Sequence, residues 1–223
     1  MASASHRAER RHPMAEKVDF KKLDAYRARA GEVRLLDVPP LQYLAIDGHG
    51  DPNTSEQYAG ALAALYPVAY SLKFASRREL GGDYVVMPLE GLWWADDMDA
   101  FTVARDKSRW SWTLLIMTPD WVDDAMLARA VAQVAAKSDP PRRLGDLRLQ
   151  RLAEGRCVQT LHVGPYDDEG PVLARLHDEV LPSEGLRPTG RHHEIYLSDP
   201  RRTAPERLRT ILRQPVATAT TNA

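Results

Sequence analysis

The order of apolar segments, which occurs twice along the chain, constrains the fold more than any other feature. In the first half, residues 43–46 read as a strand, 58–66 as a helix, and DYVVMPLEGLWW and SRWSWTLLIMTPDW as two further strands. The second half gives CVQTLHV, PVLARLHDEV, RHHEIYLS and a short closing element over 207–216. Two such strand-helix-strand-strand units predict an α+β fold in which a mostly antiparallel sheet carries a ligand groove between the repeats.

The same segments divide the chain into parts. We expect a first repeat over about 34–119, a linking helix over 120–137 and a second repeat over about 146–216, all within one domain that spans 18–216. Residues 1–17 are polar and basic and lack apolar periodicity, which predicts a flexible arm, and 217–223 predict a flexible tail. The stretch 18–30 is expected to cross the surface as a short helix or a loop.

Composition excludes several functional classes. Among the 223 residues, 43% are apolar and 27% charged, and 30 basic against 31 acidic side chains leave a net charge of -1. This near-neutral balance argues against nucleic acid as a partner. No segment approaches the roughly 20 continuous apolar residues of a membrane helix, and the N-terminus lacks a signal-peptide core, so we expect a cytoplasmic protein without membrane contact. The oligomeric state stays open.

The residues that commonly hold metals or act as nucleophiles form no recognisable motif. The single cysteine, Cys157, lies beside an apolar strand and is interpreted as a buried structural thiol. The histidines show no metal-ligand spacing with acidic or cysteine partners, and no phosphate-binding loop or nucleophile elbow is present. We therefore predict no metal and no organic cofactor.

One polar strand face offers a group for acid-base chemistry. In HHEIYLS, strand alternation places His192, Glu194 and Tyr196 on one face and residues 193, 195 and 197 on the other. If the first face lines an apolar groove, Glu194 loses hydration and suits the role of a general base, while Tyr196 or another tyrosine can stabilise developing negative charge. A solvated sheet face with an ordinary surface carboxylate gives the same pattern.

Aromatic side chains are concentrated on neighbouring strands. Trp110 and Trp112 are two residues apart and share a face, whereas Trp93 and Trp94 are adjacent and point to opposite faces. With Tyr70 and Tyr166, these tryptophans predict a cage that stacks on a hydrophobic, planar small molecule, at roughly 25 cal/mol per Å² of apolar surface buried. The alternatives are that the tryptophans fill the core and that Tyr166 packs on the helix near Pro171. The sequence does not decide between Trp93 and Trp94 as the inward ring.

A second carboxylate occupies the matching position of the first repeat. Aligning MPLEGLWW with GRHHEIYLS places Glu90 opposite Glu194 in the duplicated plan. Glu90 is therefore a candidate second acid in the groove. A structural ion pair with Lys73 or Arg109 explains its presence equally well.

Longer segments of the chain are similar to a known family. The runs TLHVGPYDDEGPVLARLHDEV, GRHHEIYLSDPRRTAPERLRTILRQPV, PLEGLWW and WSWTLLIMTPDWV resemble stand-alone GyrI-like proteins, and the resemblance extends from about residue 17 to residue 216. It implies a duplicated strand-helix-strand-strand fold, related to the effector domains of multidrug-responsive transcription regulators, with a ligand between the repeats. Those regulators carry a separate DNA-binding domain, for which this chain leaves no room.

Within that family, the Trp-Trp strand together with the His-His-Glu-Ile-Tyr strand resembles the cyclopropanoid cyclopropyl hydrolases. The resemblance implies hydrolysis of the three-membered ring of DNA-alkylating antibiotics such as yatakemycin, with an aromatic cage and an acidic residue as the site. The corresponding expectation is that Glu194 activates water, that Tyr196 or another tyrosine stabilises the phenolate, and that the aromatic residues and His192 bind the substrate. The alternative is a non-catalytic protein that sequesters a small molecule or contacts gyrase.

Overall fold

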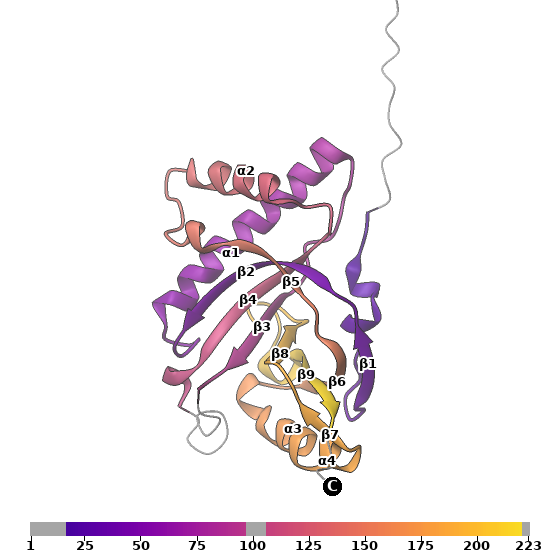
Figure 1. Ribbon diagram of the computed structural model, residues 1–223. Helices are drawn as coiled ribbons and strands as arrows, with labels where there is room; N and C mark the ends of the chain where they lie inside the picture. Colours follow the sequence, from indigo (N-terminus) through magenta and orange to yellow (C-terminus); the bar gives the residue numbers. More distant parts are fainter. Residues whose placement is uncertain (1–16, 97–105, 220–223) are drawn as a thin grey trace, which may run out of the picture.

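A strongly twisted antiparallel sheet forms the centre of the molecule in the computed structural model, which describes residues 17–96 and 106–219 (Figure 1). Its strands follow the order β1-β6-β9-β8-β3-β4-β2-β5, and β7 pairs with β9 beside this path. Every pairing between these strands is antiparallel. The predicted α+β class with a mostly antiparallel sheet is thereby confirmed.

The two repeats follow the same order of elements. The first comprises β2 (Leu41–His49), α1 (Glu56–Ala75), β3 (Leu89–Trp94) and β4 (Ser111–Thr118). The second comprises β6 (Gly155–Val163), a helical segment of α3 (Gly170–Ala174), η8 (Arg175–Val180) and α4 (Leu181–Ser183), then β7 (Leu186–Pro188), β8 (His192–Tyr196) and β9 (Arg209–Thr218). The segment predicted as a short closing element is thus a ten-residue strand that pairs with β6 and β8.

Remaining elements connect or flank the repeats. The stretch 18–30 holds two single 3-10 turns, η1 (Phe20–Lys22) and η2 (Asp24–Tyr26). Helix α2 (Asp124–Ala135) links the repeats and is followed by η6 (Leu144–Asp146). The predicted arm over 1–17 lies outside the described residues except for residue 17, and so do residues 220–223 of the predicted tail. Among the helices of the described ranges, none is long and apolar enough to cross a membrane.

An exchange of strands joins the two repeats. Strand β1 (Arg34–Val38) lies at the start of the range expected for the first repeat but pairs with β6 of the second. Strand β5 (Arg148–Leu152) lies at the start of the range expected for the second repeat but pairs with β2 of the first. At the centre of the sheet, β3 of one repeat pairs with β8 of the other, which sets Gly91 directly opposite Glu194. Both halves therefore contribute to any site built on this central pair.

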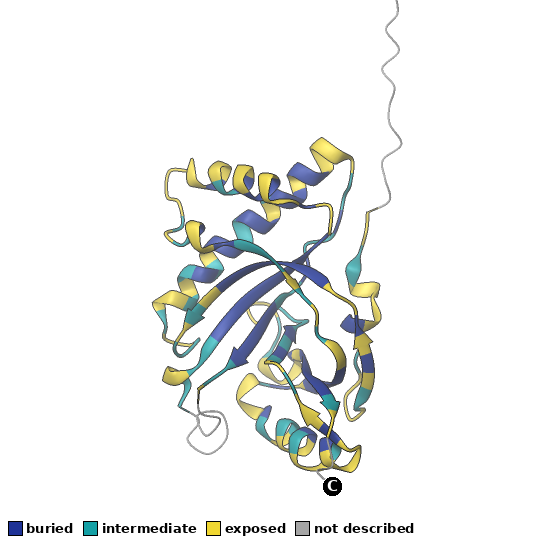
Figure 2. Ribbon diagram, in the orientation of Figure 1, coloured by how far each residue is buried: buried dark blue, intermediate teal, exposed yellow. Residues whose placement is uncertain are grey.

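The sheet has two differently covered faces. One, which we call the helix face, carries Trp93, Trp112 and Glu194, and the rings of Trp93 and Trp112 contact Tyr58 of α1. The opposite face carries Tyr43, Glu90 and His193, and η2 covers it through a hydrogen bond from the Tyr26 hydroxyl to Glu90. Both faces are buried near the middle of the sheet (Figure 2).

Candidate functional site

Aromatic rings from both repeats meet on the helix face around the central strand pair. Trp93 stands directly opposite Trp112 on β4 and opposite His192 on β8, so all three point to the same side of the sheet. Ring centroids lie 5.7 Å apart for Trp93 and Trp110, 6.3 Å for Trp93 and Tyr58, and 5.5 Å for Tyr166 and Tyr196. We call this set the aromatic cluster: Tyr58, Trp93, Trp110, Trp112, Tyr166 and Tyr196.

A carboxylate lies within the cluster and is held by a chain of hydrogen bonds. The Trp93 indole Nε1 donates to the Tyr196 hydroxyl over 3.0 Å, and that hydroxyl donates to Glu194 Oε2 over 2.7 Å. The side chain of Glu194 is 14% exposed. A hydroxyl has a single proton, so the bond from Trp93 leaves that proton for Glu194 and fixes one of the two carboxylate oxygens.

Three tyrosines near this carboxylate resist ionisation. Burial raises the pKa of Tyr58 and Tyr196 well above the ordinary value, and the negative charge of Glu194 is the next cause for both. Burial, together with Glu169 and Glu194, raises the pKa of Tyr166 to about 12. All three phenols therefore keep their protons at neutral pH and are hydrogen-bond donors.

Space for the hydrogen-bond chain depends on Gly91, which stands opposite Glu194. A Cβ atom at this position would lie 2.7 Å from Trp93 Nε1 and 3.2 Å from the Tyr196 hydroxyl. We expect Gly91→Ala to displace the Trp93 indole and to destabilise the protein by about 1–3 kcal/mol, because the buried strand pair offers little room. Denaturant unfolding and tryptophan emission measure both effects. Gly145→Ala is the control, since a Cβ added there would meet no atom within 4 Å. Equal stability of the two variants would contradict the prediction.

The prediction that Glu90 shares a groove with Glu194 is wrong. Glu90 pairs with Ile195 in the strand register, whereas Gly91 pairs with Glu194, so the two carboxylates lie on opposite faces of the sheet. Glu90 is fully buried and contacts Tyr26 and His193. The suggested partner Lys73 binds Asp83 instead. One residue of register reverses the face of a side chain, and the duplicated plan did not reveal that difference.

Some of the other predicted binding residues lie in the aromatic cluster, and some lie outside it. His192, Trp93 and Tyr166 lie beside Glu194 or Tyr196, and Trp110 contacts Trp93. The roles of these residues stay predictions. Trp112 is fully buried, and its indole donates to the Gly50 carbonyl, so it forms the floor of the cluster.

Trp94 points to the opposite face, where the Arg191 guanidinium stacks 3.4 Å from its ring centre. Trp93 is thereby the member of the pair that lies on the helix face. Tyr70 is half exposed on α1 and contacts Phe74, outside the ring contacts that form the cluster, and its role stays a prediction.

Sequence reasoning missed two residues of the site. Tyr58 on α1 stacks on Trp93, but its helical spacing indicated only a core position. Glu169, just before α3, is buried and raises the pKa of Tyr166 and Tyr196. No signal marked Glu169, whereas the position of Tyr58 in the first turn of α1 could have indicated that it faces the strand ends.

A buried ionic network occupies the opposite face behind the cluster. His193 lies 2.9 Å from Glu90 through Nε2 and 2.9 Å from Glu154 through Nδ1, and Glu154 accepts a 2.7 Å hydrogen bond from Arg213. Carboxylates beside both ring nitrogens favour the imidazolium form. The environment accordingly raises the pKa of His193 to about 9 despite burial, since Glu154 and Glu90 favour its charge, and His193 and Arg213 lower the pKa of Glu154 to about 2 despite burial.

This network predicts how stability depends on pH. The raised pKa of His193 contributes stability that is fully present below 6.5 and is lost as the pH rises through about 9. The lowered pKa of Glu154 contributes stability that is present above 4.5 and is lost as the pH falls through about 2. We expect the free energy of unfolding to fall by about 3 kcal/mol between pH 6.5 and 9.5 through His193 alone. Urea unfolding across this range measures it, and His193→Gln should remove the slope; an unchanged slope in that variant would refute the assignment.

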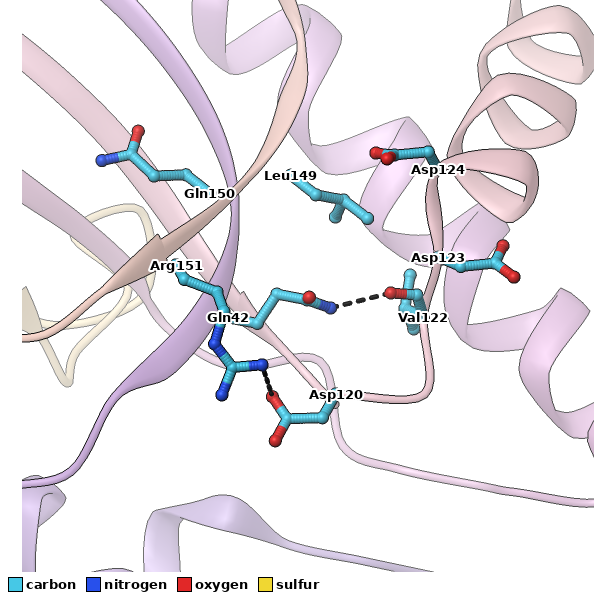
Figure 3. A pocket seen from close by; sticks show the side chains of 8 residues that line it. All are labelled: Gln42, Asp120, Val122, Asp123, Asp124, Leu149, Gln150 and Arg151. Carbon is cyan, nitrogen blue, oxygen red and sulfur yellow. Dashed lines mark hydrogen bonds and ion pairs between the residues drawn. The ribbon is translucent and has the colours of Figure 1, made fainter.

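A cavity of about 340 Å³ lies elsewhere, between β5 and the start of α2 (Figure 3). Half of the residues that line it are charged, including Asp120, which lies 3.6 Å from Arg151. The Gln42 amide at its inner side donates to the Val122 carbonyl. Because none of the aromatic cluster lines it, this cavity does not extend the site around Glu194. Within residues 17–96 and 106–219, no group of three or more His, Cys, Asp or Glu side chains is arranged to hold a metal ion.

Comparison with known proteins gives the family. Residues 31–217 match the model of the GyrI-like small molecule binding domain. The chain belongs to the GyrI-like family. No curated protein sequence matched the chain.

Several solved structures are similar to this chain over most of its length. An uncharacterized conserved protein from Listeria innocua is 39% identical with a TM-score of 0.81, covering 90% of this chain and 100% of that chain. Two crystal structures of a hydrolase from the same organism are 37% and 38% identical, with TM-scores of 0.78 and 0.79, and cover 90% and 91% of this chain and 100% of theirs. The C-terminal domain of EcmrR is 12% identical with a TM-score of 0.55, covers 84% of this chain and 98% of that chain, and shares the fold alone.

Proposed function

We propose that this GyrI-like protein is a hydrolase that opens the cyclopropyl ring of cyclopropanoid DNA-alkylating antibiotics of the yatakemycin and CC-1065 type. The observation that carries the proposal is a partly buried carboxylate, Glu194, held by the Tyr196 hydroxyl among closely packed aromatic rings. The similarity to hydrolases from Listeria innocua supports a hydrolytic reaction. The choice of a spiro-cyclopropyl substrate rests on the resemblance of the two site strands to the cyclopropanoid branch of the family.

Capture of the substrate rests on the aromatic cluster. Such antibiotics are planar and apolar, and they would stack against Trp93, Trp110 and Tyr166 at the junction of the repeats. The last of these rings is 37% exposed and lies at the outer side of the cluster. Stacking of this kind fixes the reactive carbon relative to Glu194, which is a large part of what the protein must supply.

The chemistry requires one water molecule and no cofactor. The water oxygen forms a bond to the cyclopropyl methylene carbon while the bond from that carbon to the spiro carbon breaks. The electron pair of the broken bond enters the ring, and the dienone becomes a phenolate. Glu194 takes one proton from the water, and the phenolate oxygen accepts a proton when the product leaves. Tyr58 and Tyr166 both remain protonated, so they would donate hydrogen bonds to the developing phenolate.

Incubation of the protein with a cyclopropanoid alkylator in ¹⁸O-labelled water tests the proposal. The expected result is a ring-opened product that carries one labelled oxygen and accumulates beyond one equivalent of protein, faster than without protein. Mass spectrometry measures both the label and the amount. Absence of product above the uncatalysed background would overturn the proposal.

A second candidate function is sequestration of an apolar small molecule without catalysis. The description of the family as a small molecule binding domain favours it, and the aromatic cluster would serve it equally well. In that case the same incubation gives a stoichiometric complex and intact compound. The two functions therefore differ in one measurable quantity, the number of labelled product molecules formed per protein.

A further inference from the structure

Both ring nitrogens of His192 are buried without a hydrogen-bond partner among the described protein atoms. The side chain is 16% exposed and lies on the helix face directly opposite Trp93. Buried polar atoms in folded proteins almost always have a partner, so two unpaired nitrogens on one ring call for an explanation. The ring-opening steps proposed for Glu194 and the tyrosines leave this ring without a role.

The neighbouring carboxylate presents two unequal oxygens. Glu194 Oε2 accepts the hydrogen bond from Tyr196, which is itself oriented by Trp93. The other oxygen, Oε1, lies 3.5 Å from His192 Nε2. That separation is too long for a strong direct hydrogen bond. Because Nε2 is closed to water in this structure, a water that bonds to both atoms enters only when the aromatic cluster opens to admit the substrate.

The surroundings of His192 hold the imidazole in place. Its ring lies beside Trp93 on the neighbouring strand. On the other side, His177 of η8 comes close enough that His192 lowers the pKa of His177, a smaller effect than burial. Since the ring is largely buried beside Trp93 on the strand pair, His192 is held next to Glu194.

We propose that His192 is a further catalytic residue, which holds the nucleophilic water together with Glu194. The inference rests on the proposed function. The water donates one O–H to Glu194 Oε1 and the other to the Nε2 lone pair of His192, so that a lone pair of the water oxygen points toward the substrate. When the carbon–oxygen bond forms, the proton on the Oε1 side passes to Glu194, and His192 keeps its own protonation state. Oε1 is the oxygen that takes the proton because Oε2 already accepts the hydrogen bond from Tyr196.

Kinetics of two substitutions at position 192 test the inference in the intact protein. His192→Phe keeps a flat ring but removes the acceptor, and we expect kcat to fall by about 10²-fold with little change in KM. His192→Asn keeps an acceptor and should recover part of the loss. The control is His49→Phe, because His49 is exposed on β2 and binds Ser111 on the opposite face. A His192→Phe variant with the kcat of the control would overturn the inference.

A crystal structure of the unsubstituted protein with a planar analogue that lacks the cyclopropyl ring bound in the cluster gives a second, independent decision. A water at hydrogen-bond distance from both His192 Nε2 and Glu194 Oε1 is expected, and density that shows no such water would overturn the inference even if the variants do not fold. If the wild-type protein forms no labelled product, the proposed hydrolase fails, while the water position still decides whether His192 and Glu194 share a water.

Discussion

Replacement of Glu194 by glutamine is expected to lower kcat for a spiro-cyclopropyl substrate by at least about 10²-fold, because the amide cannot accept a proton from water. Binding should persist. The amide oxygen can still accept the hydrogen bond from Tyr196, and the aromatic rings that contact the substrate are unchanged. Steady-state formation of the water adduct measures kcat, and quenching of tryptophan emission measures affinity.

The matched control for this substitution is Glu206→Gln. Glu206 is exposed on the turn before β9, and the same chemical change there should leave kcat and affinity unaltered. Thermal unfolding of both variants separates a chemical effect from a folding defect. Retention of full turnover by Glu194→Gln, with the fold intact, would remove Glu194 from the mechanism.

Arg213→Met is expected to give the largest loss of stability, about 3–5 kcal/mol, because it leaves Glu154 charged and buried without its guanidinium partner. Arg213 is fully buried and also bonds to Gln159 and to the Ala25 carbonyl, so the methionine leaves several polar groups unsatisfied. Chemical denaturation measures the free energy of unfolding.

A control for the arginine substitution lies on the same strand. Arg209 begins β9 with an exposed side chain, so Arg209→Met makes the same chemical change outside the network. We expect its stability to stay within about 0.5 kcal/mol of the unsubstituted protein. Similar losses in both variants would show that the buried pair has no special importance.

Much of the fold could be predicted from residue patterns because the hydrophobic period reports local structure directly. Alternation in HHEIYLS correctly separated the faces of His192 and His193, and adjacency alone showed that Trp93 and Trp94 point apart. The repeated order of elements indicated that the halves join into one sheet. These inferences need only the geometry of a strand or helix.

Other features depend on pairing across the sheet, which a linear pattern does not contain. Glu90 and Glu194 match in the duplicated plan, yet the register of β3 against β8 places them on opposite faces. The ionic partners of His193 are Glu90 on β3 and Glu154 in the connection between β5 and β6, both far away along the chain. Tyr58 joins the site only because α1 packs its first turn over Trp93. Each of these contacts is set by tertiary packing.

The exchange of β1 and β5 has a consequence for how the chain acquires its structure. Arg34 pairs with Gln159, so the edge strand β1 can pair only after residues more than a hundred positions further along the chain have been synthesised. Neither half possesses a complete set of strand neighbours, and a polypeptide cut in the connection after α2 would yield two fragments with open edges. Such fragments should stay unstructured or aggregate when produced separately, and should regain a native circular dichroism spectrum only when both are present together.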